Sequence, residues 1–176
     1  WIAQSKIAQG DLISVSAVTV LCAVAAFGLS LRPQEPVDNG VALLVSGFII
    51  AGVAFLAPSA SIAQLALAIT AATGGFLVWT WPKIRLGFAQ VAIVAMALPM
   101  IWLAAQASHF SRADDYALIV VTAIAFAPTI RAAVIRSDAL STDTLRPIAT
   151  GVTAVVIGAV ALAIAYFSSS GQTYLG

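Results

Sequence analysis

The chain has 176 residues, of which 61% are hydrophobic and 9% are charged, and its net charge is +1. Soluble globular domains carry about 25% charged residues, and a domain of this size exposes much of its surface to water. The composition therefore excludes a soluble globular protein and indicates a chain whose main solvent is lipid. The small net charge also excludes a basic surface for nucleic acid, so no nucleic-acid partner is expected.

Six apolar stretches meet or approach the length of about 20 residues that a membrane-spanning helix needs. They cover residues 12–31, 40–57, 61–81, 86–107, 116–135 and 147–167. The sequence therefore predicts an all-α fold, a polytopic transmembrane helix bundle of about six spans joined by short loops, as a single domain over residues 1–176. A five-span alternative stays open, in which the second or third stretch is re-entrant.

Residues that begin or end helices flank these stretches. Pro58 ends the second stretch, and Pro147 stands at a helix-start position of the sixth. Asp114 or Asp115 is expected to cap the fifth helix. The connection from residue 57 to residue 61 is nearly a bare turn, which predicts a tight antiparallel hairpin of the second and third stretches.

Lysine and arginine in the connections predict the orientation. In a six-span chain, the connections 32–39, 82–85 and 136–146 share one side, which holds six basic residues when Arg131 is included, against two on the other side. Both termini are therefore expected on the non-cytoplasmic side. The alanine-rich, loop-poor composition favours a prokaryotic inner membrane. A helix upstream of Trp1 would change this orientation, and that alternative stays open.

Aromatic side chains at the predicted helix ends are typical of the membrane–water interface. Tyr116 opens the fifth stretch, and five other aromatic residues are expected to close the third, fourth and sixth. They are Trp79 with Trp81, Trp102, and Tyr166 with Phe167.

Charged residues are scarce within the predicted spans. No Asp, Glu, Lys or His lies in the middle third of any span, although such residues mark ion paths and proton relays in membrane proteins. Arg131 is the only charged residue within a span. It is expected to anchor a helix end by extending toward the interface, or else to bind a lipid headgroup or a partner carboxylate. Arg136 and Arg146, in the connection 136–146, are candidate partner or lipid contacts.

Gln64 and Gln90 are the strongest polar groups within spans. We expect them to bond across helix–helix contacts, with a substrate or quinone contact as the alternative. Small residues also recur at a four-residue spacing that allows helix backbones to approach closely, either within the bundle or against another subunit. The sets are Gly47 with Ala51, Ala66 with Thr70 and Gly74, and Ala154 with Gly158.

Residues that weaken helices occur inside three spans. Gly74 and Gly75 lie in the third, Pro99 in the fourth and Pro128 in the fifth. Each proline removes a backbone hydrogen bond. Broken helices build substrate sites in transporters, but prolines are also ordinary in membrane helices. A functional break at these positions is therefore one of two open interpretations.

No arrangement of residues predicts catalysis. His109, beside Asp114 and Asp115, is a thin ligand set for a metal, so no metal site is expected. The single histidine excludes a bis-histidine haem, and no cofactor is evident. The sequence contains no nucleotide-binding loop and no nucleophile–base pattern, and an enzyme is not expected.

These observations favour a non-catalytic integral membrane subunit or scaffold of a larger membrane complex, in contact with membrane lipids and other membrane protein subunits. One alternative is a small transporter or carrier for a neutral or apolar solute, with a cavity near Gly74, Pro99 and Pro128. Another is the membrane-sensing portion of a longer signalling protein. A membrane-embedded enzyme ranks last.

Overall fold

The computed structural model describes residues 36–80, 90–110, 113–134 and 145–172, together with residues 16, 20, 21, 23, 24 and 28. Apart from residues 57–59 and 113–114, these residues are helical, and no strand occurs among them. The all-helical fold is thus confirmed over the described part of the chain. The elements are α3 (Pro36–Leu56), α4 (Ala60–Thr80), α5 (Gln90–Phe110), α6 (Asp115–Ala123), the 3₁₀ segment η1 (Ile124–Phe126), α7 (Ala127–Val134) and α8 (Leu145–Gln172).

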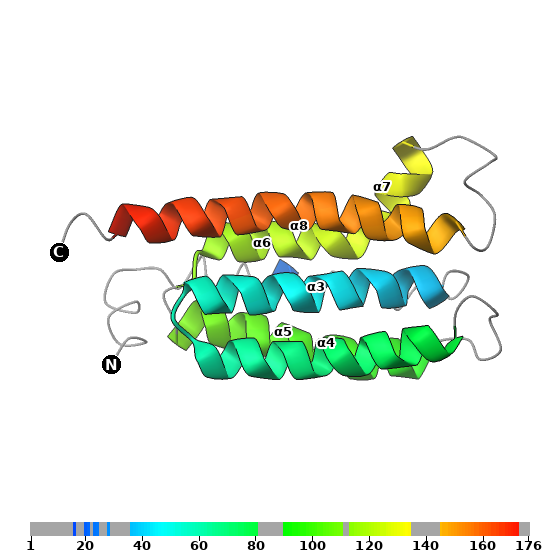
Figure 1. Ribbon diagram of the computed structural model, residues 1–176, viewed down its shortest axis with the longest axis horizontal. Coiled ribbons are helices and arrows are strands. Elements are labelled where there is room, and N and C mark those ends of the chain that lie inside the picture. The colour runs from blue at the N-terminus through cyan, green and yellow to red at the C-terminus, as the bar shows by residue number, and fades with distance from the viewer. Residues whose placement is uncertain are drawn as a thin grey trace.

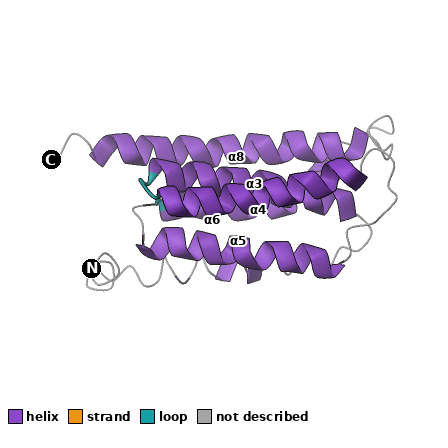
Figure 2. Cartoon of the chain, turned by 60° about the horizontal axis from the view of Figure 1, so that its bottom comes forward, coloured by secondary structure: helices purple, strands orange, loops and turns teal. Residues whose placement is uncertain are grey.

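The long helices run side by side in a bundle (Figures 1 and 2). Helix α3 is central: it packs against α4 on one side and α8 on the other, and it also contacts α5, α6 and η1. Helices α3, α5 and α8 begin at the same end of the bundle, at the right of Figure 1, which we call the Asp38 end. Helices α4 and α6 begin at the opposite end, which we call the Asp114 end.

Four helical segments of the described chain are long and apolar enough to cross a membrane, namely Val37–Leu56, Ala60–Trp79, Asp115–Val134 and Leu145–Ser170. A 20-residue helix is about 30 Å long, which matches the hydrocarbon core of a bilayer. Ala92–Ser108 is apolar but shorter. The membrane-spanning character is therefore supported, whereas the count of about six is not confirmed. The predicted span 12–31 lies largely outside the described residues.

The hairpin of the second and third spans forms as predicted. Ala57 and Ser59 donate backbone hydrogen bonds to the carbonyl oxygens of Val53 and Ala54, at 3.0 and 2.9 Å. Because these bonds hold the end of α3, the chain reverses within a few residues. Helix α4 then runs back along α3.

Several expected helix boundaries are corrected. The connection placed at 32–39 is shorter, because α3 begins at Pro36, so that Asp38 lies in its first turn. Proline is well suited to the first position of a helix, where its missing N–H is not needed. Helix α8 is longer than the stretch 147–167 at both ends. Trp102 does not close the fourth span, because α5 continues for two more turns to Phe110.

Small residues bring the helices of the core together. A Cβ atom at Gly47 on α3 would overlap the Thr70 hydroxyl of α4, and one at Gly158 on α8 would lie 2.6 Å from Cγ1 of Ile49. The four-residue small-residue pattern therefore serves packing inside the bundle at these positions. Several alanines are completely buried in the same core: Ala42, Ala54, Ala66, Ala107, Ala117, Ala127, Ala154 and Ala161.

Only one of the three helices with expected weak points is interrupted. Helix α4 remains α-helical through Gly74 and Gly75, and α5 through Pro99. The span Asp115–Val134 instead tightens into η1 directly before Pro128. There, the N–H of Ala127 donates to the Ile124 carbonyl three residues earlier, as in a 3₁₀ turn. Because Pro128 has no N–H, it cannot donate a bond that would continue the α-helical pattern.

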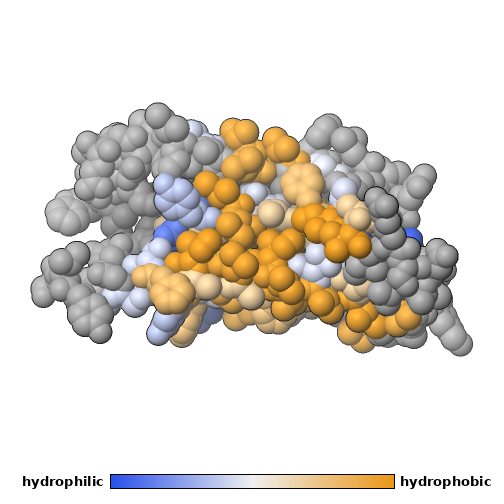
Figure 3. Space-filling view, turned by 90° about the horizontal axis from the view of Figure 1, so that it is seen from above, coloured by the Kyte–Doolittle hydropathy of each residue, from blue (hydrophilic) through white to orange (hydrophobic). Residues whose placement is uncertain are grey.

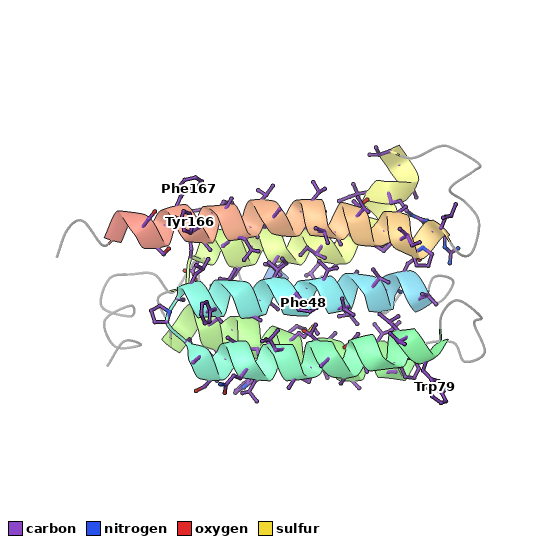
Figure 4. All side chains as sticks on the ribbon, in the orientation of Figure 1. Phe48, Trp79, Tyr166 and Phe167 are labelled. Atoms are coloured by element: carbon purple, nitrogen blue, oxygen red, sulfur yellow. The ribbon has the colours of Figure 1, made fainter. Side chains whose placement is uncertain are left out.

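The outer surface is largely apolar. Figure 3 shows a hydrophobic area across the middle of one face. Aromatic side chains mark both ends, since Trp79 lies at the Asp38 end and Tyr166 and Phe167 lie toward the Asp114 end (Figure 4). All three are exposed, as are Trp102 and Tyr116. Trp79, Tyr166 and Phe167 stand where an interfacial aromatic belt would hold the bundle at a fixed depth.

Candidate functional site

A cluster of charged side chains joins three helices at the Asp38 end of the bundle. Asp38 lies in the first turn of α3, Arg131 near the end of α7, and Arg146 at the second position of α8. The Oδ2 atom of Asp38 is 3.0 Å from Nε of Arg146 and 3.6 Å from Nη2 of Arg131. One carboxylate therefore binds two guanidinium groups that are 15 residues apart in sequence.

The cluster is buried to a degree that differs between its members. The Asp38 side chain is completely buried, the Arg131 side chain is 9% exposed and the Arg146 side chain is 24% exposed. An isolated charge in such a place is strongly destabilising, so burial is tolerated only because the opposite charges meet. Arg146 is the member that reaches the surface.

Helix dipoles favour two members of the cluster and oppose the third. The helix dipole stabilises an acidic residue in a first turn and a basic residue in a last turn. Asp38 stands in the first turn of α3, and Arg131 stands in the last turn of α7. Arg146 is a basic residue in a first turn, which is unfavourable. The contact with Asp38 offsets that placement, because the carboxylate neutralises part of its charge.

Arg131 attaches the end of α7 to the rest of the bundle. Past Pro128, it is the one buried residue of the described part of α7. Figure 1 shows α7 leaning away from the bundle beyond η1. Beyond Pro128, the inward contact of this segment therefore includes the ion pair of Arg131 with Asp38. The neighbouring exposed residues are Thr129, Ile130, Ala132, Ala133 and Val134.

A second polar group closes the Asp114 end. The Asp114 carboxylate caps α6, accepting hydrogen bonds from the N–H groups of Tyr116 and Ala117 at 2.8 and 3.2 Å. Its other oxygen accepts a hydrogen bond from the hydroxyl of Ser168 on α8. The hydroxyl of Ser108 on α5 donates to Asp115 at 2.7 Å. These bonds tie α5, α6 and α8 together, and Asp114 is confirmed as the cap.

Buried hydroxyl groups of α4 form hydrogen bonds within the bundle. Thr70 and Thr73 donate to the carbonyl oxygens of Ala66 and Ile69 one turn earlier, and Thr73 also lies 3.4 Å from the sulfur of Met96. Hydrogen bonds of this kind satisfy a buried hydroxyl without a ligand. The described hydroxyls in the bundle centre therefore act in packing.

Of the sequence-predicted site residues, Arg131 and Arg146 meet at Asp38, whereas Gln64 and the expected helix-break positions do not come together in one site. Gln64 is exposed on α4, and Pro99 is exposed on α5. Gly74 faces Leu44 of α3, whereas Gly75 points away from the bundle, where a Cβ atom would meet nothing within 4 Å. Pro128 is buried beside η1. Arg136 and the side chain of Gln90 lie outside the described residues.

No group of three metal-ligating side chains occurs in the described part of the chain. The side chain of His109 lies outside that part. The Asp38 cluster holds charges that pair with one another, and this arrangement joins helices instead of supplying a nucleophile with its base.

Arg131 and Arg146 are predicted from the sequence as candidate contacts, but Asp38 is not, because the predicted boundaries assign it to the connection 32–39. Pro36 followed by an acid two residues later is a helix-start signal, and it would have placed Asp38 in a first turn. The pairing of Asp38 with both arginines has no signal in one sequence, since the three residues come from distant segments. Arg131, expected to anchor a helix end or to bind a headgroup or partner carboxylate, instead meets a carboxylate of its own chain.

Comparison of the chain with protein-family models, with curated proteins and with solved structures finds no match.

Proposed function

We propose that this chain is a non-catalytic integral membrane subunit or scaffold that binds another membrane protein through the outer face of α4. The observation that carries the proposal is the composition of that face. Its middle is made of small exposed residues, and the space beside Gly75 is open. These residues are Ala68, Ala71, Ala72 and Gly75.

Small residues on a membrane helix favour contact with another helix. Lipid tails are as apolar as leucine side chains, so association in a membrane depends on close backbone packing, which small residues allow. The inner face of α4 already uses this principle, since Thr70 fits against Gly47 of α3. The outer face offers a second surface of the same type, which supports a helix of a partner at this place.

Gln64 extends this face by one turn. It is exposed, and it precedes Ala68 by four residues, so the two lie on one side of the helix. A glutamine amide can donate and accept hydrogen bonds across a helix–helix contact in a membrane. A partner helix with a polar side chain at the matching depth would complete the contact.

The described interior supports a scaffold better than a transporter. Thr70 and Thr73 are bonded within the bundle, and Asp38 is engaged by two arginines. Of the residues expected to line a solute cavity, Pro99 points outward. A carrier for a neutral or apolar solute needs polar or open space near the bundle centre, and these residues do not provide it.

The proposal also includes the membrane in which the chain lies and its orientation there. The chain lies in a prokaryotic inner membrane, with the Asp38 end on the cytoplasmic side and both termini on the other. Lysine and arginine in the connections support this orientation. Reporter fusions at the two termini test it: activity of a periplasmic reporter at both ends is expected, and activity of a cytoplasmic reporter at either end contradicts it.

The experiment that tests the function is the native mass and composition of the particle extracted in a mild detergent. We expect a particle larger than one chain, with partners in fixed proportion. Gly75→Leu fills the outer face of α4 and is expected to release the partner. Val156→Leu enlarges an exposed residue of α8 and serves as the matched control. A small homogeneous particle of this chain alone would overturn the proposal.

A further inference from the structure

The Arg146 side of the charged cluster has the properties of an anion site. We infer that Arg146 binds a phosphate group, and that the source of this phosphate is the headgroup of an anionic membrane lipid. The inference rests on the cluster at the Asp38 end and is independent of the partner proposed for α4.

The charge of Arg146 is only partly neutralised by Asp38. That carboxylate is shared, because its Oδ2 atom lies within 4 Å of both Arg146 and Arg131. The dipole of α8 adds partial positive charge at the same place, since Arg146 stands in the first turn of this 28-residue helix. The three side chains of the cluster therefore hold two positive charges and one negative charge, which favours an anion at Arg146.

The geometry leaves Arg146 accessible. Asp38 is completely buried and Arg131 is nearly so, whereas the Arg146 side chain is 24% exposed. Asp38 approaches Arg146 at Nε, and a guanidinium carries five N–H donors in a fixed fork. The contact with Asp38 involves Nε, and the Arg146 side chain as a whole remains partly exposed. Arginine in this setting suits the paired oxygens of a phosphate.

The depth of the cluster favours a lipid as the source of the phosphate. Asp38 and Arg146 each stand at the second position of an apolar segment long enough to cross a membrane, Val37–Leu56 and Leu145–Ser170. Both therefore lie at the edge of the hydrocarbon layer, where headgroup phosphates are concentrated. Trp79 is exposed at the same end of the bundle, as expected for an aromatic residue at the membrane–water interface (Figure 4).

The test measures lipid retained by the purified full chain in mixed micelles of phosphatidylglycerol and phosphatidylcholine. The wild-type chain is expected to retain phosphatidylglycerol in preference to phosphatidylcholine. Arg146→Gln is expected to lower this retention at least about tenfold, because hydrogen bonds between charged groups are the strong ones. Lys83→Gln removes one positive charge from the connection between α4 and α5 and is the matched control, for which retention is expected to stay unchanged.

Phosphorus NMR with inorganic phosphate forms the second arm. Binding of inorganic phosphate that depends on Arg146, without a preference for phosphatidylglycerol, supports the phosphate site and assigns it to a free anion. If Arg146→Gln does not fold, Arg146→Lys carries the test: it keeps the positive charge but loses the paired N–H donors, so it should retain less phosphatidylglycerol than the wild type. Equal losses for Arg146→Gln and Lys83→Gln, no dependence on Arg146 in either arm, or full retention in Arg146→Lys would overturn the inference.

Discussion

Gly47 of α3 lies directly against Thr70 of α4, so that a Cβ atom at Gly47 would overlap the Thr70 hydroxyl and come within 2.9 Å of Cε of Met100. The two helices approach this closely because one of them has no side chain at the contact. The Thr70 hydroxyl is held in place by its bond to the Ala66 carbonyl, at 2.7 Å. The central contact between α3 and α4 therefore has little room to adjust.

Gly47→Ala is predicted to destabilise the bundle by about 1–3 kcal/mol, which is typical of an added carbon in a tight core. The measurement is the free energy of unfolding in detergent. Gly75→Ala is the matched control, since its Cβ atom meets nothing within 4 Å. In a helix, that change is expected to be neutral or stabilising by up to about 1 kcal/mol. Equal effects of the two substitutions would contradict the packing described here.

Gly158 of α8 and Ile49 of α3 are predicted to be coupled. A Cβ atom at Gly158 would lie 2.6 Å from Cγ1 and 2.7 Å from Cδ1 of Ile49. Gly158→Ala alone and Ile49→Ala alone should each destabilise, the first by overlap and the second by a cavity. Together, they should destabilise less than the sum by about 0.5–3 kcal/mol, because the alanine at 158 occupies the vacated space. Additive effects in the double-mutant cycle would argue against the contact.

Asp38→Ala is predicted to be among the most damaging single changes, at about 3–5 kcal/mol, because it leaves buried guanidinium groups without this carboxylate. Arg146→Gln should be milder, since the Arg146 side chain is 24% exposed and its charge is partly solvated. The free energies of unfolding of both variants provide the comparison. A larger effect at Arg146 than at Asp38 would be inconsistent with the cluster.

Loss of Asp38 should also release α7 before it affects the rest of the span. Beyond Pro128, Arg131 is the one buried residue in the described part of α7. The 3₁₀ segment η1 comes directly before α7 and can act as a hinge. Amide hydrogen exchange in Asp38→Asn is expected to rise in Ala127–Val134 while α6 keeps its protection. Uniform loss of protection across both helices would show that the ion pair supports the whole bundle, not this segment.

Asp114→Ala is predicted to destabilise more than Ser168→Ala. The first substitution removes both the cap of α6 and the acceptor for Ser168, whereas the second leaves the cap in place. The difference should be about 1 kcal/mol, the usual effect of an N-cap. Thermal unfolding of the two variants, with Tyr116→Phe as a control at an exposed neighbour, provides the measurement. Equal melting temperatures for Asp114→Ala and Ser168→Ala would disprove the capping role.

Sequence alone was sufficient for the helical membrane character, the hairpin of α3 and α4, and a cap at Asp114 or Asp115, of which the structure shows Asp114. Each of these depends on residues close together in the chain: an apolar run of sufficient length, a proline at a helix end, or an acid before a helix. Tertiary structure decided which faces pack. It turned Gly74 toward Leu44 and Gly75 outward, although the two are adjacent, because neighbouring positions on a helix point about 100° apart.

Tertiary structure also decided the partners of Asp38. Arg131 and Arg146 are visible in the sequence as basic residues near span ends, but their meeting with a carboxylate about 100 residues earlier depends on how α7 and α8 pack on α3. Hydropathy predicts about six spans; four helices of the described residues are long and apolar enough to cross a membrane, and the first predicted stretch lies largely outside those residues. Local pattern specifies which segments become helices, whereas burial and charge pairing are properties of the assembled bundle.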